Sequence, residues 1–518
     1  MHFYKKIGTI FKTRLPLFVF LSLYALFVGL TYRDFGISND EPDEYAYAKQ
    51  LYVYWKTRDP HISQQFKAWD GNNPGVIGYN RVYQTFLYML NGSESFEGYH
   101  LLNFIFAGIF LILVFEFCLD LTKNQWLAIL APIFFIFTPR YLGHIPINPK
   151  DIPFLHLYLI TLMAIYWLQK KPLLLEIVVL GLLFGLTQAN RLIGFSLYLV
   201  YLIWQGLNAV KETNNLPKKI KQLFLKIVLI GLCAFCIQVI TTPYLTTAPF
   251  KHFLDLIKIN INFPWQGSIL LWGKNYDSTN LPWFYLPSWI LATTPIFILF
   301  LSAIGLLRKK VSNNLNNFRL LLIISLSVNL SIFYLTQPVV YDGLRHMLFL
   351  VAHLVLLAWI IFVNLWQSQS SIKNKILFIA LLLINLSCIV AQYFQLHPYQ
   401  YSFFNNLVGS ARQAQYWFAT DYWGTSYKEA TQMLNQKPDT QQPCLVASCG
   451  DPQQVKYYLK GNCQYTLNLD QADYLFCHTR VDNLRIKANH ETLIFEIKKN
   501  GVILNKIYQL KNQNSDLW

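Results

Sequence analysis

Residues 15–45 read LPLFVFLSLYALFVGLTYRDFGISNDEPDEY. The first half, Leu15–Leu30, is an apolar run long enough to cross a bilayer as a helix. The second half, Ser38–Tyr45, carries four carboxylates within five residues. Anionic headgroups repel acids, and the hydrocarbon beside them excludes charge. The local sequence leaves two interpretations open: a solvated acidic loop, or carboxylate chemistry held at the water–lipid boundary.

The composition is that of a polytopic membrane protein. Of 518 residues, 54% are hydrophobic, 16% aromatic and only 14% charged. Apolar runs of near-spanning length predict about eleven transmembrane helices, and the runs at 126–139 and 173–189 are short enough to be broken or re-entrant. The predicted spans are 15–31, 100–121, 126–139, 152–169, 173–189, 191–207, 222–241, 285–307, 319–336, 347–366 and 375–394.

The distribution of positive charge predicts the orientation. The net charge is +16, and the Lys and Arg residues gather in alternate connections, where Glu212 is the only clear acid. This bias places the N-terminus in the cytoplasm. The basic excess is then a topology signal; no basic stripe with interleaved aromatics indicates nucleic-acid binding. Because no small-residue cleavage site precedes Arg33, we expect a retained signal anchor.

Two long outer segments follow from this orientation. The first outer loop, about 32–99, is rich in aromatic residues, which favours helices lying flat on the membrane surface. The tail from 395 to 518 is predicted to be a second domain with a small α/β fold, helical at about 410–436. The transmembrane module is then 1–394. Shorter outer loops are expected near 140–151, 242–284 and 337–346.

The tail contains four cysteines, and in an external domain they favour disulfides. All three pairings stay open. Zinc is the alternative, but the spacing of the first two lacks the usual paired-ligand pattern. The four are Cys444, Cys449, Cys463 and Cys477.

The second outer loop combines charges with prolines that block a continuous helix. Arg140, His144, Lys150 and Asp151 all lie within it. Arg140 and Lys150 on their own are explained by side chains reaching for lipid headgroups. That does not explain His144 and Asp151 beside them. We therefore expect a functional loop.

Two further outer turns carry cations at the ends of spans. Arg191 lies between two apolar segments, where an arginine is usually paired or binds an anion. The loop near 337–346 contains Tyr341, Asp342, Arg345 and His346. Either Asp342 and Arg345 form an ion pair, or Arg345 and His346 face a phosphate.

Acids and cations therefore concentrate on one side of the membrane. That arrangement suits a substrate that is part lipid and part phosphate: a carboxylate acts as general base, and cations stabilise the phosphate as leaving group. The alternative is a transporter or flippase of lipid-linked sugars. Transporters, however, place charged sites near the midplane.

Several motifs together resemble the GT-C membrane glycosyltransferases. They are the Asp40-Glu41 pair after the first span, the loop Arg140–Asp151, the turn Tyr341–His346 and the stretches His397–Gly409 and Asp421–Ala430. The branch that they resemble contains the protein O-mannosyltransferases and the aminoarabinose-lipid A transferases, in a bacterial subgroup. The resemblance covers most of the chain.

The resemblance implies a GT-C fold and inverting transfer of a hexose or pentose from a polyprenyl-phosphate carrier. The reaction would take place at the periplasmic face of a bacterial inner membrane. Asp40 is then the expected general base, Glu41 assists or orients it, and Asp151 is a second acid. Asp43 and Glu44 are left with a solvated or orienting role. Candidate phosphate ligands are Arg140, Lys150, Arg191, Arg345 and His346, and further site candidates are His144, Tyr341 and Asp342.

The resemblance leaves the acceptor open among lipid, glycan and protein. The 242–284 loop is far too short for the luminal domain of eukaryotic-type protein O-mannosyltransferases. The acid-x-acid spacing of Glu41 and Asp43 is like that of metal-using oligosaccharyltransferases. The branch that the chain resembles usually needs no metal, so we expect no metal and no other cofactor.

Overall fold

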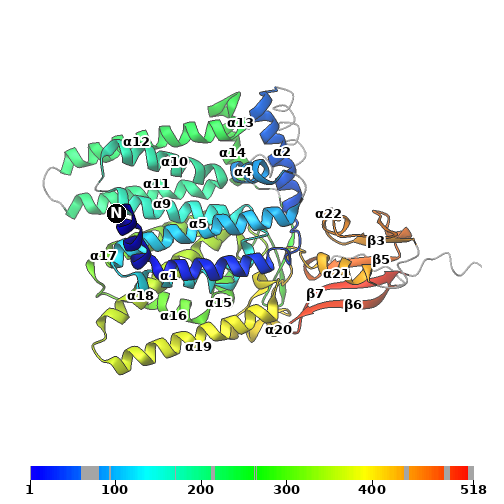
Figure 1. Ribbon diagram of the computed structural model, residues 1–518. Helices are drawn as coiled ribbons and strands as arrows, with labels where there is room; N and C mark the ends of the chain where they lie inside the picture. Colours follow the sequence, from blue (N-terminus) through cyan, green and yellow to red (C-terminus); the bar gives the residue numbers. More distant parts are fainter. Residues whose placement is uncertain are drawn as a thin grey trace, which may run out of the picture.

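A helical bundle with a small sheet domain at one end makes up the protein (Figure 1). The computed structural model describes residues 2–59, 81–92, 95–169, 171–211, 216–261, 263, 265–436, 443–482 and 491–510. The part of the predicted first outer loop at 60–80 lies outside these residues. The prediction of a helical polytopic membrane protein with a small C-terminal α/β domain is confirmed.

Within the described residues, nine helices are long and apolar enough to cross a membrane. Two shorter apolar segments complete the eleven predicted positions: α6 (Gln125–Ala128) with α7 (Leu130–Ile136), and α16 (Ile296–Leu307). The long helices are α1 (His2–Thr31), α5 (Phe96–Thr122), α9 (Asp151–Leu168), α10 (Leu173–Asn190), α11 (Ser196–Lys211), α12 (Leu216–Thr241), α17 (Asn313–Thr336), α18 (Leu348–Ser368) and α19 (Ile372–Leu396).

The helix boundaries correct the sequence prediction for one span. The predicted span 285–307 is wrong as a single helix: α15 (Tyr285–Thr293) ends before α16 begins. Pro295 separates them, because proline lacks an N–H and restricts the residue before it to extended backbone. The run at 126–139 is broken between α6 and α7, whereas the short run at 173–189 forms one continuous helix, α10.

α18 is the central helix of the bundle. In its most apolar 18-residue stretch 89% of the residues are buried, against 6% for α19 and 17% for α12. The exposed side chains of α12 and α19 are mostly apolar, as lipid-facing helices require. Both run along edges of the bundle in Figure 1.

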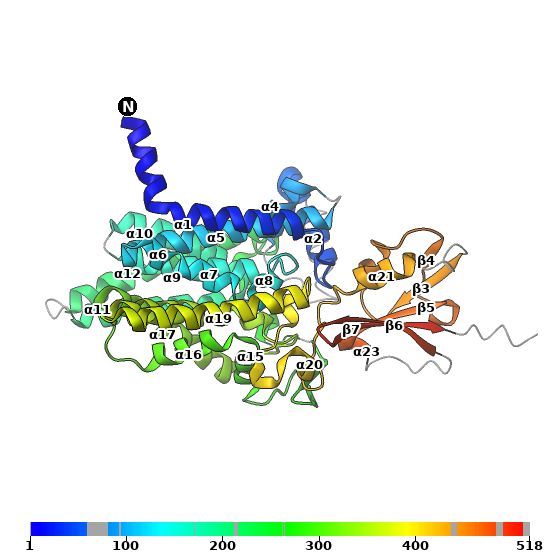
Figure 2. The same ribbon diagram turned by 60° about the horizontal axis from the view of Figure 1, so that its bottom comes forward.

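One end of the bundle, which we name the domain end, carries the sheet domain together with α2 (Glu41–Thr57), α4 (Val82–Asn91) and α8 (Pro139–His144) (Figures 1 and 2). The described residues of the predicted loop 242–284 form α13 (Pro243–Thr246), α14 (Pro249–Ile261) and the hairpin β1 (Ser268–Leu271)–β2 (Lys274–Asp277).

The sheet domain is a five-stranded mixed sheet in the order β4-β3-β5-β7-β6. β3 runs parallel to β4 and β5, and β7 runs antiparallel to β5 and β6. The strands are β3 (Cys444–Ser448), β4 (Cys463–Tyr465), β5 (Tyr474–His478), β6 (Glu491–Lys499) and β7 (Val502–Leu510). The predicted helix at 410–436 is instead two short ones, α20 (Ser410–Ala414) and α21 (Tyr427–Asn435), and α22 (Pro452–Lys456) and α23 (Thr479–Asp482) follow.

The four cysteines of this domain form two disulfides, Cys444–Cys463 and Cys449–Cys477.

Peptide mapping without reductant is expected to recover these two linkages. Adding reductant is expected to make the sheet domain more sensitive to protease, because each bridge limits the freedom of the unfolded chain. Recovery of either of the other two pairings would contradict the arrangement of β3, β4 and β5.

A close backbone contact holds α8 against the segment after α19. A Cβ added at Gly143 would meet the backbone nitrogen of Tyr401 and lie 2.7 Å from the carbonyl carbon of Gln400. Gly143→Ala is expected to cost about 1–3 kcal/mol, since overpacking forces backbone shifts. A lowered apparent Tm in detergent measures this. Gly206→Ala in α11 is the control, because a Cβ there meets nothing within 4 Å; equal effects of both substitutions would contradict the contact.

Candidate functional site

Asp40 lies at the N-cap position of α2, yet its side chain makes no capping hydrogen bond. Its Oδ2 is instead 2.9 Å from Nη1 of Arg345 and 3.3 Å from Nζ of Lys150. The side chain of Asp40 is 21% exposed, so a substrate can reach it. The structure thus brings together three predicted site residues from three separate segments of the chain.

Glu41 points away from this cluster and fixes the loop before α2. Its carboxylate accepts hydrogen bonds from Ser38 N at 2.7 Å and Ser38 Oγ at 3.0 Å, and it lies 2.9 Å from His100 Nε2. Both Glu41 and His100 are fully buried. Glu41 therefore sets the backbone that presents Asp40.

Glu44 is buried as well, so of its two predicted roles, solvated or orienting, the solvated one is wrong. Its carboxylate lies 2.9 Å from Lys150 Nζ and 3.1 Å from Arg81 Nε, and it accepts a hydrogen bond from Gln84. A buried carboxylate is costly without such partners. Lys150 therefore bridges Glu44 and Asp40, and it ties the second outer loop to the start of α2.

The second outer loop forms a chain of hydrogen bonds. Asn148 Oδ1 accepts from the backbone N–H of Asp151 at 2.9 Å, so its Nδ2 donates to Asp151 Oδ2 at 3.0 Å and to His144 Nδ1 at 2.9 Å. His144 must then carry its proton on Nε2, which donates to the Tyr422 hydroxyl at 2.8 Å. Burial and the charges of Arg140 and Arg345 hold the pKa of His144 well below its usual value, so the ring is neutral.

Arg191 forms an ion pair with Asp151. Asp151 is 3% exposed and starts α9, whereas Arg191 follows the last residue of α10. Two residues predicted for different roles, a second acid and a phosphate ligand, are thus direct partners. An anion that binds Arg191 has to compete with Asp151 for the guanidinium.

Arg140 is enclosed by the segment that follows α19. It donates to the carbonyl of Phe403 at 3.2 Å and to the Tyr422 hydroxyl at 3.1 Å, and its guanidinium lies over the rings of Trp289 and Phe404. It is only 2% exposed, and Nη2 has no hydrogen-bond partner among the described residues. Burial lowers the pKa of Arg140, partly offset by Tyr422.

Arg345 connects Asp40 to the sheet domain. Its Nε is 3.4 Å from Asp342 Oδ2, and Asp342 Oδ1 is 2.8 Å from Nη1 of Arg480 in α23. The Asp342–Arg345 ion pair considered from the sequence therefore forms, and Arg345 also reaches Asp40. Four charges of alternating sign run from α2 to the sheet domain.

Aromatic rings frame this charged row. The guanidinium of Arg345 lies 4.8 Å from the ring centre of Tyr341 and 4.6 Å from that of Trp423. Tyr341 stacks on Trp265 with a ring distance of 3.9 Å, and His346 meets the edge of Tyr341 at 4.6 Å. His346 Nδ1 is buried without a hydrogen-bond partner in the described part of the chain.

The pKa shifts reflect this balance of charges. Burial opposes ionisation of Asp40, but Lys150 and Arg345 outweigh it and hold the pKa of Asp40 well below its usual value. The same pairing, with Asp40 and Glu44 outweighing burial, raises the pKa of Lys150. For Asp342, burial outweighs Arg480 and Arg345 and raises the pKa. Asp40 is therefore ionised at neutral pH.

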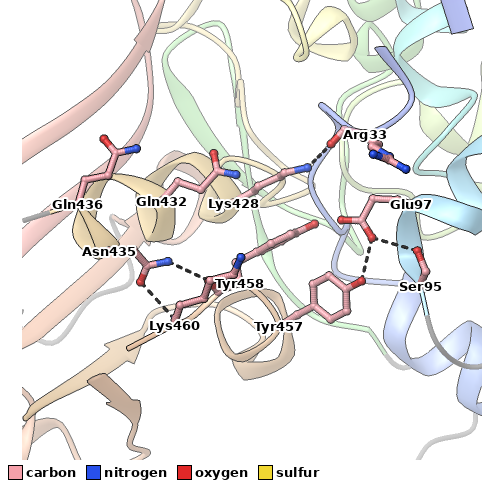
Figure 3. A pocket seen from close by; sticks show the side chains of 10 residues that line it. All are labelled: Arg33, Ser95, Glu97, Lys428, Gln432, Asn435, Gln436, Tyr457, Tyr458 and Lys460. Atoms are coloured by element: carbon pink, nitrogen blue, oxygen red, sulfur yellow. Dashed lines mark hydrogen bonds between the residues drawn. The ribbon is translucent and has the colours of Figure 1, made fainter. Parts of the chain in front are cut away.

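Two pockets lie near the ends of helices. An apolar pocket of about 290 Å³ lies between α4, α5, α9 and α10, and Pro153 and Asn190 in its wall are close in sequence to Asp151 and Arg191. A larger, polar pocket of about 910 Å³ lies between the loop before α2 and the sheet domain (Figure 3). There Lys428 donates to the carbonyl of Arg33, and Tyr457 donates to Glu97 at 2.8 Å.

Sequence reasoning missed several members of the site. Tyr422 and Asn148 lie within two of the motif stretches. Their side chains are uncharged and common, so the sequence offers no reason to select them. Arg81 and Arg480 lie in segments without any chemical signal. Only the fold brings Arg480, far along the chain, next to Asp342.

No family model matches the chain, and no curated protein matches its sequence. Among solved structures, the crystal structure of ArnT from Cupriavidus metallidurans bound to undecaprenyl phosphate is similar, with 10% sequence identity and a TM-score of 0.49. The match covers 94% of this chain and 98% of that chain. At this identity and TM-score the likeness concerns the course of the chain and says nothing of substrate or chemistry, which must come from the geometry of the site.

Proposed function

We propose that the protein is a GT-C glycosyltransferase that moves a sugar from a polyprenyl-phosphate carrier to an acceptor, with inversion at the anomeric carbon. One observation carries this proposal: Asp40, partly exposed, lies between Lys150 and Arg345 where the membrane bundle meets the sheet domain. A base and two cations at one point on a membrane boundary suit transfer from a lipid phosphate.

The cations serve the leaving group. When the bond between the anomeric carbon and the phosphate oxygen breaks, the carrier phosphate changes from a singly charged diester to a monoester that takes up a second negative charge. Lys150 and Arg345 are placed to stabilise that charge, and both are mostly buried, which strengthens their effect. Arg191 and His346 are further candidates for the same role.

Asp40 serves the acceptor. The acceptor hydroxyl attacks the anomeric carbon from the face opposite the phosphate, and its proton passes to the carboxylate. Without substrate, Lys150 and Arg345 keep the pKa of Asp40 low, which makes it a weak base. A bound phosphate would share these cations and so raise the pKa of Asp40. Donor binding thus improves the base.

The apolar pocket between α4, α5, α9 and α10 is the proposed site for the first prenyl units of the carrier. Its walls include Phe106, Ile109 and Leu157. Phe86 and Ile109 in its lining are exposed on the outside of the bundle, and Pro153 and Asn190 are close in sequence to the ion pair Asp151–Arg191. A chain in this pocket would bring its phosphate to the charged cluster.

The remaining assignments follow the charge bias of the sequence. We propose that the protein lies in a bacterial inner membrane with its N-terminus in the cytoplasm, the domain end in the periplasm, residues 1–394 as the catalytic module and 395–518 as the periplasmic domain. Two disulfides in the sheet domain support an oxidising compartment for that end.

A flippase for the same lipid-linked sugar is the competing function. An assay in detergent separates the two, because transport has no meaning without a membrane. Loss of labelled sugar from the carrier with formation of a glycosylated product supports transfer. No turnover with any donor and acceptor supports the flippase.

Asp40→Asn is expected to lower the transfer rate by about 10²–10⁴-fold, the usual contribution of a general base. The variant is expected to fold and insert normally, since Asn keeps the shape of the side chain. Asp34→Asn is the matched control: Asp34 lies in the same loop, is 46% exposed and pairs with His397. Full activity of Asp40→Asn would overturn the role of Asp40.

The pH dependence of kcat/KM tests the pairing of Asp40 with Lys150. With its pKa held low, Asp40 stays ionised as the pH falls to about 5, so activity persists there. Lys150→Gln is expected to raise the pKa of Asp40 and shift the acid limb to higher pH, besides lowering kcat/KM. Lys49→Gln on the exposed side of α2 is the control. An unmoved acid limb in Lys150→Gln would contradict the coupling.

A further inference from the structure

Asp342 is a buried carboxylate that lies between two cations. Its side chain is only 4% exposed. Oδ1 lies 2.8 Å from Nη1 of Arg480, and Oδ2 lies 3.4 Å from Nε of Arg345. These two arginines are its only ion-pair partners among the described residues. Each carboxylate oxygen thus faces one cation, and the closer cation comes from the sheet domain.

The backbone fixes the place of this carboxylate. Asp342 and Gly343 both have positive φ, 56° and 69°. Aspartate adopts this left-handed backbone more readily than most residues, and glycine adopts it without steric cost. The hydroxyl of Tyr285 donates to the carbonyl of Gly343 at 2.7 Å, which fixes the turn. A change in the pairing of Asp342 therefore falls on the arginine side chains and not on the turn.

The sheet domain fixes Arg480 through the two residues before it. Nδ1 of His478 donates to the carbonyl of Asp421 at 2.6 Å, and the hydroxyl of Thr479 accepts from the backbone N–H of Asp421 at 3.2 Å. The guanidinium of Arg480 lies 5.5 Å from the ring centre of Trp265. Arg480 therefore meets the turn from a fixed position.

Two stacked rings connect the arginines a second time. Trp265 contacts Arg480 and stacks on Tyr341 with a ring distance of 3.9 Å. The guanidinium of Arg345 lies 4.8 Å from the ring centre of Tyr341. Cations are attracted to the faces of aromatic rings. The positions of the two guanidinium groups are thus coupled by contacts that do not involve Asp342.

Arg345 is the cation that faces two acids. Its Nη1 lies 2.9 Å from Oδ2 of Asp40, and its side chain is 5% exposed, which strengthens its ion pairs. Arg480 balances the charge of Asp342, so the charge of Arg345 is left to other anions. These are Asp40 and, in the proposed reaction, the carrier phosphate. Without Arg480, Arg345 would be the one ion-pair partner that Asp342 keeps among the described residues.

We infer that Arg480 is a positioning residue for the reaction centre: it neutralises Asp342 and so leaves Arg345 available to the carrier phosphate. Arg480 acts through Asp342 and touches no reacting atom. The inference rests on the proposed function for the phosphate. It extends that function, because the sheet domain then takes part in setting the charge of the site.

The test measures binding of farnesyl phosphate to the full-length protein in detergent, with farnesol as the probe that lacks the phosphate. Arg480→Gln is expected to weaken binding of farnesyl phosphate about tenfold and to leave binding of farnesol unchanged, since contacting charges are coupled by about this much. Asp342→Asn in the Arg480→Gln background is expected to recover most of the lost affinity, because no acid then draws Arg345 away. Asparagine also accepts the left-handed backbone of the turn.

Two further variants and this double variant separate the inferred role from a structural one. Arg480→Lys keeps the charge and is expected to retain most of the affinity. Lys498→Gln is the matched control and is expected to bind as the native protein does, since Lys498 is 51% exposed on β6 and pairs with Glu496. If Arg480 only fastened the sheet domain to the bundle, Asp342→Asn would remove the other half of that contact and would restore nothing.

The outcomes distinguish this inference from the proposed function. Unchanged binding in Arg480→Gln, a loss that Asp342→Asn does not reverse, or failure of the native protein to bind farnesyl phosphate overturns the inference, whether or not transfer is demonstrated. Absence of transfer with any donor overturns the proposed function, and full activity of Asp40→Asn overturns its base. Neither of these two results alters a coupling of Arg480 to phosphate binding that the double variant has shown.

Discussion

The ion pairs of Lys150 with Asp40 and Glu44 are the interaction on which the site depends. Charged side chains buried in a membrane bundle are costly unless each has a partner of opposite sign. Lys150 meets this need for two acids at once and joins the second outer loop to α2. Loss of the Lys150 ammonium would leave Glu44, which is 1% exposed, with Arg81 as its remaining cationic partner among these pairs.

The same requirement extends the network across the domain end. Arg345 pairs with Asp40 and Asp342, and Asp342 pairs in turn with Arg480 of the sheet domain. Ion pairs thus connect the candidate base, Asp40, to Arg480 of the sheet domain, which lies far along the chain from it. The charges of this site are already paired with one another, so the proposed lipid phosphate would bind by sharing cations that now pair with acids.

Much of the candidate site could be predicted from the sequence because its residues are unusual where they occur. Asp40, Arg140, Lys150 and Arg345 are charged side chains at the ends of apolar runs, where charge is costly and demands an explanation. Their partners carry no such signal. Tyr422 is one of many tyrosines, and Arg480 lies in a polar domain where arginine is ordinary. Contacts of this kind depend on distances across the fold, which spacing along the chain does not encode.

The sequence by itself determined the positions of the nine long apolar helices among the described residues and the presence of the small C-terminal α/β domain, because apolar runs report directly on what a bilayer accepts. It did not determine that the predicted span 285–307 is interrupted at Pro295, that 268–277 forms a hairpin, or how the four cysteines pair. Only the tertiary structure decided which acids are buried and which one is open. Glu41, Glu44 and Asp40 are neighbours in sequence, but helix α2 turns their side chains in different directions, so Asp40 alone combines both cations with access from outside.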